Sequence, residues 1–267
     1  MRRRVVRLPK KVVDPFPSSQ PERFVEIMTK KGTIRGVLHE SHGRKGPLVI
    51  IVHGYFSSDK LGPARLYVQI ARAIAQLGLR VFRFDFIGFG ESDGDMSSVT
   101  LKSELEDGET VISRMKRMEK SKIILLGHSF GCNLSILLAE RSPSVVKVIA
   151  ISPVYEKNSF DRYLDESQVD ELKRNGVVSR KGFLVSRKFI EALNMAPGFD
   201  ECNLRIPVTI IRGTSDEFYS SEAVSTVVNK FPRWRLIEIE GADHNFMVPT
   251  LRANLIKAVV RELKRYA

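Results

Sequence analysis

The chain has 267 residues, of which 43% are hydrophobic, so it is long enough for one large domain or two small ones around a sizeable core. Its formal net charge is +12, and no apolar run approaches the ~20 residues that a membrane-spanning helix needs. The two cysteines, Cys132 and Cys202, have no partner at a metal-ligand spacing, and they argue against a disulfide framework. We expect Cys132 to be a buried, inert thiol.

Residues 1–20 are predicted to form a basic N-terminal arm. The arm lacks the apolar core of a signal peptide, and no nucleic-acid motif with interleaved aromatic residues follows it. We therefore expect a solvated terminus, no nucleic-acid partner, no transmembrane segment and a cytoplasmic protein. Six basic residues precede the first acidic one, Asp14: Arg2, Arg3, Arg4, Arg7, Lys10 and Lys11.

The next part of the chain indicates strands that alternate with helices. Residues 24–29 and 33–40 alternate apolar and polar side chains around Lys31-Gly32, which predicts a hairpin. The run "LVIIV", residues 48–52, is typical of a strand buried on both faces. Apolar residues then recur at helical spacing up to Gly78, a C-cap signal. Further strands are predicted at residues 80–84, 123–126, 145–152, 208–212 and 235–240, and further helices at 101–118, 133–140 and 251–266.

This alternation predicts an α/β fold with a mostly parallel central sheet and helices on both faces. We assign residues 21–152 and 204–267 to this core. Residues 153–203 separate two sheet strands by some fifty positions, and they combine many charges with large apolar side chains. Because a disordered linker would not carry so many large apolar residues, we interpret them as a small helical cap inserted into the core. The helix at 101–118 is opened by Thr100, with Glu104 one position beyond the ideal capping-box partner.

The sequence Gly127-His128-Ser129-Phe130-Gly131 joins a predicted buried strand to a predicted helix. At such a sharp turn the serine is forced into a strained backbone conformation, and small neighbours are needed to avoid collisions. The turn would raise the Ser129 hydroxyl at the carboxyl end of the sheet, above a helix N-terminus. The five-residue pattern alone is weak evidence, but its position between strand and helix makes it much stronger.

A serine hydroxyl is a poor nucleophile and needs a base. His244 follows the last predicted strand, and Asp216 follows the strand before it, which is the order expected for base and acid in a sheet of this kind. Because the carboxyl ends of parallel strands meet at one edge, we expect Ser129, Asp216 and His244 to converge. Glu217 is kept as an alternative acid, and Asp243 is expected to brace its loop.

Two backbone N–H groups are expected to form an oxyanion hole, one from Phe130 and one from the loop "HGYFSS". Tyr55 is our first choice in that loop and Phe56 the second, while His53 is expected to brace it. The glycine-rich stretch of residues 83–94 matches neither phosphate-binding pattern, so we expect Asp85 and Ser92 to hold this loop under the site.

At this point the chain resembles the α/β-hydrolase superfamily, through "HGY", "FRFDFIGFGESDG", "GHSFG", "RGTSDEF" and "GADHNF" in order. Within the superfamily it is similar to carboxylesterases related to cinnamoyl and feruloyl esterases, which carry a cap segment like residues 178–193. The resemblance implies Ser129, Asp216 and His244 as catalytic triad, and Tyr55 and Phe130 as oxyanion donors. The chain departs from those esterases at Ile87, at Cys132, and at Phe130, where they often have Gln.

The expected function is therefore a serine carboxylesterase that hydrolyses short- to medium-chain or aryl esters, small molecules, through an acyl-enzyme. No metal or organic cofactor is expected. A peptidase or an acyltransferase with the same triad remains an alternative, and so does a non-catalytic binding module of the same fold. The alternatives differ in which acceptor or leaving group supports turnover, or in whether any turnover occurs.

Overall fold

The computed structural model describes residues 20–41, 46–55, 59–154, 164–180, 182–195, 201–218 and 220–267. Apart from Gln20, the predicted basic arm lies outside the described residues. Within the ranges just given, no helix is long and apolar enough to cross a membrane.

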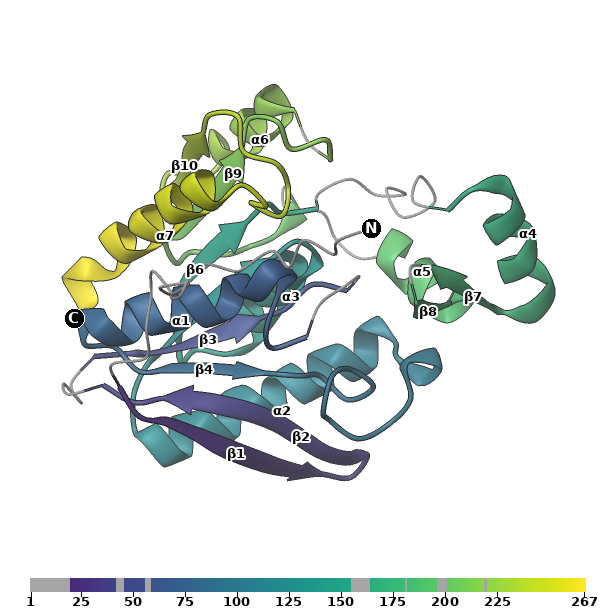
Figure 1. The fold of residues 1–267 in the computed structure, drawn as a ribbon, viewed down its shortest axis with the longest axis horizontal. Coiled ribbons are helices and arrows are strands. Elements are labelled where there is room, and N and C mark those ends of the chain that lie inside the picture. The colour runs from purple at the N-terminus through teal and green to yellow at the C-terminus, as the bar shows by residue number, and fades with distance from the viewer. Residues whose placement is uncertain are drawn as a thin grey trace, which may run out of the picture.

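Eight strands form one sheet in the order β1-β2-β4-β3-β5-β6-β9-β10. The hairpin β1–β2 pairs antiparallel, β2 pairs antiparallel with β4, and all remaining neighbours pair parallel. The parallel strands therefore end at one edge, which we call the carboxyl edge, and begin at the opposite amino edge (Figure 1). The strands are β1 (Glu22–Thr29), β2 (Gly32–His39), β3 (Leu48–Val52), β4 (Val81–Phe84), β5 (Ile123–His128), β6 (Val145–Ile151), β9 (Val208–Gly213) and β10 (Trp234–Ile239).

Helices cover both faces of the sheet, as the alternating pattern predicts (Figure 1). The helices α1 (Leu66–Leu77) and α7 (Pro249–Leu263) pack on one face, where they form one apolar cluster with the strands. On the other face, α2 (Leu101–Glu119), α3 (Phe130–Arg141) and α6 (Ser221–Val228) form a second cluster. Every residue of β3 is buried, which explains its continuous apolar run. Short 3₁₀ helices span Pro63–Arg65 (η1), Met96–Ser98 (η2) and Lys264–Tyr266 (η5).

Thr100 opens α2, as the sequence predicts, and the structure shows which residue completes its capping box. Thr100 is the N-cap, but its capping-box partner is Ser103, whose hydroxyl accepts from the Thr100 N–H while Thr100 Oγ1 accepts from the Ser103 N–H. Glu104 takes no part in the cap and is 1% exposed. Serine replaces the usual Glu or Gln because its short hydroxyl also reaches the backbone of the N-cap.

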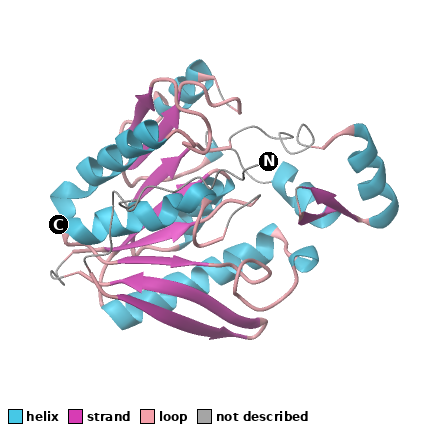
Figure 2. Cartoon of the chain, viewed as in Figure 1, coloured by secondary structure: helices cyan, strands magenta, loops and turns pink. Residues whose placement is uncertain are grey.

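Four elements between β6 and β9 do not join the main sheet: α4 (Glu166–Asn175), β7 (Val177–Arg180), β8 (Phe183–Ser186) and α5 (Arg187–Met195). We call these four elements the cap. The strands β7 and β8 pair antiparallel in a sheet of their own, so the insertion contains strands as well as the predicted helices (Figure 2). The cap contacts the core at Tyr55, whose hydroxyl donates to the Leu184 carbonyl at 3.1 Å. The predicted limits of the insertion, residues 153–203, stay a prediction.

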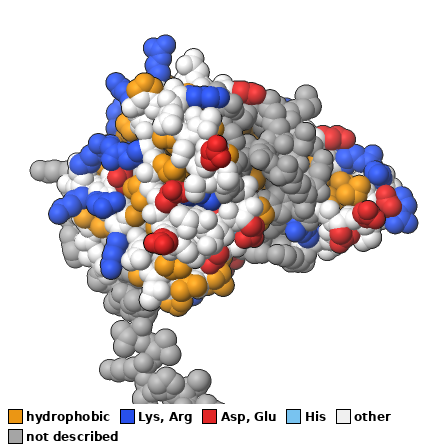
Figure 3. Space-filling view, turned by 90° about the horizontal axis from the view of Figure 1, so that it is seen from above, with side chains coloured by type: hydrophobic (Ala, Val, Ile, Leu, Met, Phe, Trp, Pro, Cys, Tyr) orange, Lys and Arg blue, Asp and Glu red, His pale blue; other side chains and the backbone are white. Residues whose placement is uncertain are grey.

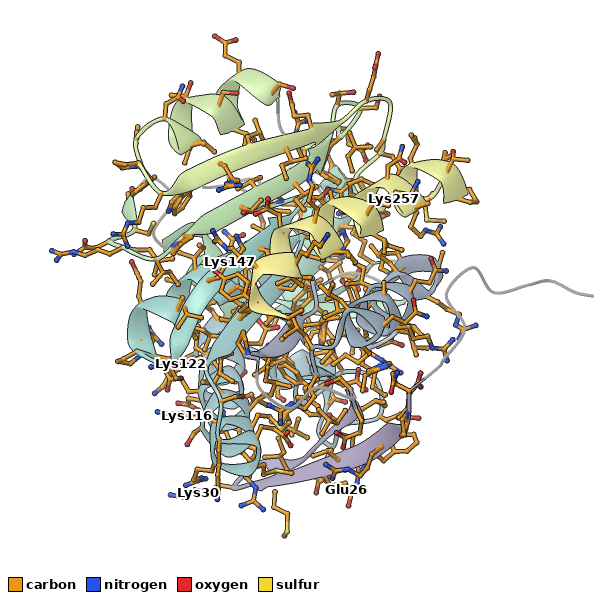
Figure 4. The ribbon with its side chains drawn as sticks, turned by 90° about the vertical axis from the view of Figure 1, so that its left-hand side faces the viewer. Glu26, Lys30, Lys116, Lys122, Lys147 and Lys257 are labelled. Carbon is orange, nitrogen blue, oxygen red and sulfur yellow. The ribbon has the colours of Figure 1, made fainter. Side chains whose placement is uncertain are left out.

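A buried charged cluster joins α7 to the sheet near the amino edge. Lys147 of β6 is 1% exposed, and its ammonium donates to Thr209 Oγ1 at 2.8 Å and to Glu262 at 3.2 Å. Figure 4 looks at this edge and labels Lys147. Because each polar atom of the cluster has a partner, the charge is accommodated in the core at modest cost.

Candidate active site

Ser129 lies at the turn between β5 and α3, in a conformation that L-residues rarely adopt. Its backbone angles are φ 54° and ψ −128°. A Cβ on Gly127 would lie 2.4 Å from the Gly131 carbonyl oxygen, and a Cβ on Gly131 would lie 2.2 Å from that of Val52. Both glycines are therefore required by close backbone approach. The strain at Ser129, of about 1–3 kcal/mol, presents the hydroxyl at the carboxyl edge.

The side chains of Ser129, His244 and Asp216 form a hydrogen-bonded chain. His244 Nε2 lies 3.0 Å from Ser129 Oγ. On the other side of the imidazole, Nδ1 lies 3.0 and 3.1 Å from the two carboxylate oxygens of Asp216. With the proton on Nδ1, the imidazole donates to Asp216 and accepts from the serine hydroxyl. Residues far apart in the sequence thus meet, as the shared strand edge predicts.

Hydrogen bonds and a close backbone contact join the loops after β9 and β10, and this places Asp216 beside His244. The Ser215 N–H donates to the Ala242 carbonyl at 3.0 Å. A Cβ on Gly213 would lie 2.0 Å from that carbonyl oxygen, so only glycine permits this contact. The Thr214 hydroxyl accepts from the Gly241 N–H at 2.8 Å.

The environment of Asp216 favours its ionised form. The carboxyl is buried, which by itself disfavours the charge, but the hydrogen bond and the charge of His244 and the N–H of Phe218 outweigh burial and lower its pKa. The Phe218 ring packs edge-on against His244, with ring centroids 4.4 Å apart. A carboxylate held ionised in this position orients the imidazole and stabilises its protonated form.

The two other acids near the site are placed differently. Glu217 is exposed, whereas Asp216 beside it is buried against the imidazole. Asp243 accepts from the N–H groups of Asn245 at 2.9 Å and Met247 at 3.0 Å, so it braces the turn that carries His244.

The loop after β3 contacts the turn that carries Ser129 through Gly131. His53 braces this loop, since it donates from Nδ1 to the Gly54 carbonyl at 2.6 Å and accepts at Nε2 from the Phe86 N–H at 3.1 Å. Burial lowers the pKa of His53, which keeps the imidazole neutral. Tyr55 follows in this loop and is 1% exposed. The second choice for an oxyanion donor, Phe56, lies outside the described residues.

His128 supports the site in a way that the sequence did not reveal. Its ring lies beside that of His244, with centroids 5.6 Å apart. Its Nε2 donates to the His244 carbonyl at 3.2 Å, and its Nδ1 accepts from the Tyr67 hydroxyl at 2.8 Å. Complete burial lowers the pKa of His128 to about 3, so the ring stays neutral and keeps one donor and one acceptor. A histidine at the end of an otherwise apolar strand is the one sequence feature that marks His128 as unusual. The sequence does not identify its partners, because they come from α1 and from the loop after β10.

Hydrogen bonds to Asp85 fix the conformation of the glycine-rich loop after β4. This fully buried carboxylate accepts from the ammonium of Lys60 at 2.6 Å and from the Glu91 N–H at 2.8 Å. The Ser92 hydroxyl donates to the Asp85 carbonyl at 2.6 Å.

Cys132 is buried, with its thiol donating to the Ile151 carbonyl, and burial raises its pKa well above the usual value. Over the described residues, no group of three His, Cys, Asp or Glu side chains is placed to hold a metal.

Aromatic side chains from core and cap meet next to Ser129. The Phe189 ring of α5 lies 4.0 Å from Tyr55 and 5.5 Å from Phe130, measured between centroids. Phe89 lies 5.3 Å from Tyr55. The cluster makes this side of the site apolar.

Three comparisons, with protein families, with curated proteins and with solved structures, each found proteins similar to this chain. Residues 43–169 match the Hydrolase_4 family, described as "Serine aminopeptidase, S33". "Esterase EstD" of Thermotoga maritima is 30% identical over 161 residues, which are 57% of this chain and 37% of EstD, so the chain spans well under two thirds of that relative.

Solved structures share the fold over nearly the whole chain. The structure "Ferulic Acid bound to Est1E from Butyrivibrio proteoclasticus" superposes with a TM-score of 0.75 and 20% identity, covering 91% of this chain and 98% of Est1E. "Alpha/beta hydrolase domain-containing protein 10 from mouse" gives a TM-score of 0.74 and 20% identity, covering 92% and 100%.

Proposed function

We propose that this chain, which shares the fold of α/β hydrolases, is a member of that superfamily and acts as a serine carboxylesterase on short- to medium-chain or aryl esters. The observation that supports this most is the unbroken hydrogen-bonded chain from Ser129 Oγ through His244 to Asp216, with distances of 3.0 Å on both sides of the imidazole. Nucleophile, base and orienting acid are then within the reach that acyl transfer requires.

In the proposed reaction Ser129 Oγ attacks the ester carbonyl carbon while its proton moves to His244 Nε2. Asp216 stabilises the resulting imidazolium. His244 then gives the proton to the departing alcohol, and an acyl-enzyme is left. A water molecule, deprotonated by His244, attacks the acyl carbon and releases the carboxylic acid, which restores Ser129.

The tetrahedral intermediates carry a negative oxygen, which the backbone N–H groups of Phe130 and Tyr55 are proposed to bind. Phe130 is the first residue of α3, where backbone N–H groups point out of the helix. The contact of Gly131 with Val52 brings the loop that carries Tyr55 next to it. Each such donor is worth about 3–4 kcal/mol of the barrier.

The substrate class follows from the aromatic cluster. Phe130, Phe189, Tyr55 and Phe89 form a buried aromatic cluster beside Ser129, and an apolar wall of this kind favours an apolar acyl chain or an aromatic acid over a charged group. The similar structure of Est1E holds ferulic acid, an aromatic acid, which supports an aryl acyl group, and the family description leaves an aminopeptidase as the second candidate.

A substrate panel separates these functions. Native chain and Ser129→Ala are assayed on aryl esters, on esters of increasing acyl length, on monoacylglycerols and on aminoacyl amides, each with and without an added alcohol acceptor. A carboxylesterase gives Ser129-dependent hydrolysis of esters that exceeds amide hydrolysis and acyl transfer. Preferential turnover of amides, or acyl transfer that exceeds hydrolysis, would replace the proposal by the corresponding alternative.

A further inference from the structure

A cavity of about 420 Å³ opens where the segment before β9 meets the start of β10. Both strands begin here, at the amino edge, whereas Ser129 lies at the carboxyl edge. The volume is within the ~300–1,000 Å³ range of small-molecule sites. Six of its lining residues matter here, four apolar and two cationic: Cys202, Leu204, Phe231, Trp234, Arg205 and Arg233.

The wall of this amino-edge cavity is held by contacts among its own residues. The Phe231 and Trp234 rings stack with centroids 4.2 Å apart and planes inclined by 20°. The backbone N–H of Trp234 donates to the Phe231 carbonyl at 3.0 Å, and Arg233 Nη1 donates to the Arg205 carbonyl at 3.3 Å. The register of β10 on β9, Trp234 opposite Val208, fixes the indole in the wall. The apolar wall is therefore built into the sheet.

The positive charge of the cavity is not neutralised. In the part of the chain that the structure describes, neither Arg205 nor Arg233 lies within ion-pair distance of a carboxylate. Glu140 of α3 accepts from the Asn203 N–H of this segment at 2.7 Å. Figure 3 shows Lys and Arg side chains gathered at the end of the molecule away from the cap, which is the amino edge. Guanidinium groups bind carboxylates and phosphates through paired hydrogen bonds.

We propose that the amino-edge cavity binds an organic anion in which a carboxylate or phosphate is joined to a small apolar, preferably aromatic, body. The anionic group meets Arg205 and Arg233, and the apolar body packs against Leu204, Phe231 and Trp234. This site is separate from Ser129 and does not rest on the proposed esterase function.

The chain contains one tryptophan, and it is in the wall of this cavity, so its fluorescence reports binding directly. Phenylacetate and phenyl phosphate are titrated into the native chain at constant ionic strength, with the neutral phenylacetamide as a third titrant. We expect a saturable change with one or both anions and none with the amide. The stronger of the two anions identifies the head group. No saturable change with either anion, or an equal change with the amide, would overturn the proposal.

The double variant Arg205→Gln/Arg233→Gln tests the assigned contacts. It should weaken binding at least about tenfold, the loss expected for one or more charge-assisted hydrogen bonds. Arg235→Gln is the matched control, because Arg235 is a neighbouring exposed arginine that pairs with Glu262 at 3.3 Å and does not line the cavity. Equal affinities in the native chain and in the double variant would contradict the site. Hydrolysis is not measured, so failure here leaves the esterase proposal unaffected.

Discussion

Ser129 combines two features that have no structural use by themselves: a strained backbone and a hydroxyl hydrogen-bonded to a largely buried imidazole. The left-handed φ of 54° costs stability, and the glycines at 127 and 131 exist to make it sterically possible. His244 is only 6% exposed, so its imidazole is held between Asp216 and Ser129 with little access to water. Strain and burial at one point are typical of a reacting group.

Replacing the acid tests the orientation of this imidazole. Asp216→Asn should fold normally but lower kcat on the order of a thousandfold or more, because an amide no longer holds the Nδ1 proton or stabilises the imidazolium. Glu217→Gln, one residue further and exposed, is the matched control and should keep nearly full activity. Steady-state kinetics on an aryl ester measure both. Near-full activity of Asp216→Asn together with a large loss in Glu217→Gln would move the acid to Glu217.

His128 is predicted to position His244. His128→Phe keeps a ring but loses the bonds to the Tyr67 hydroxyl and the His244 carbonyl. We expect kcat to fall roughly 10- to 100-fold with KM nearly unchanged, since small misplacements of a base are costly. Tyr67→Phe removes only the hydroxyl and should retain most of kcat. If His128→Phe loses stability to urea but no kcat, its role is structural only.

At the scale of elements, the site depends on backbones that touch. β3, β5 and α3 approach so closely that Gly131 has no room for a Cβ, and β9 meets the loop after β10 in the same way at Gly213. These contacts fix the carboxyl edge, where the proposed catalytic groups lie. Elsewhere, α2 places Glu104 in the core with no hydrogen-bond partner for its carboxyl group among the described residues, which reduces stability.

Gly131→Ala should disrupt the site. Its Cβ would lie 2.2 Å from the Val52 carbonyl oxygen, so α3 or the β3 loop must shift, at a cost of about 3 kcal/mol of unfolding free energy. Activity should fall by orders of magnitude even below the unfolding temperature. Gly241→Ala is the control, because its φ of 70° adds strain but no atom lies near its Cβ. Equal activities of Gly131→Ala and Gly241→Ala would contradict this expectation.

Glu104 of α2 makes stability depend on pH. Burial, aided by the charge of Asp107, raises its pKa well above 4.5, and in the described part of the chain neither of its carboxylate oxygens has a hydrogen-bond partner. The folded state therefore keeps the proton that the unfolded state loses, so the contribution of Glu104 to the unfolding free energy is largest below pH 4.5 and falls as the pH rises above that value. Glu104→Gln should remove this fall.

Urea unfolding at acidic and mildly alkaline pH measures the effect. The stability of Glu104→Gln relative to the native chain should increase with pH. Glu106→Gln is the control on the same helix, because the pKa of Glu106 is lowered by its hydrogen bond with Lys31. Because the pKa of Asp107 is raised to about 6, the unfolding free energy of Glu104→Gln should still depend on pH in the acidic range. If the unfolding free energies of the native chain and of Glu104→Gln changed equally with pH, this explanation would be contradicted.

At the scale of the whole molecule, the cap closes one side of the site through aromatic contacts. Phe189 of α5 is completely buried between Tyr55 and Phe130. Core and cap therefore share one apolar wall, and the size of the acyl group that fits should depend on the cap.

Phe189→Ala should change acyl-group selectivity. Removing the ring enlarges the proposed pocket, so the kcat/KM ratio of bulky aryl esters over acetate esters should rise about tenfold, while small esters lose binding. Leu172→Ala is the matched control, since Leu172 is a buried cap residue of α4 that contributes no ring to the cluster. Equal ratios in both variants would show that the effect comes from loosening the cap.

The sequence predicts the sheet, its helices and the residues at its carboxyl edge, because strand runs, glycine requirements and strand order are local or topological properties. It does not predict the contacts of His128, whose partners lie on distant elements. It also missed the β7–β8 hairpin, although Val178 and Val185 pair across it and Gly182 turns with a φ of 81°. Charged residues around these valines hide the apolar pattern of the two strands in the sequence. The short sheet is partly exposed and is stabilised by packing.

The central claim is that Ser129 is a nucleophile activated by His244. A fluorophosphonate probe followed by peptide mapping measures this directly. We expect the native chain to be labelled at Ser129, Ser129→Ala to be unlabelled, and His244→Ala to react far more slowly. A folded native chain that stays unlabelled, or that is labelled at another residue and equally in Ser129→Ala, would contradict the claim.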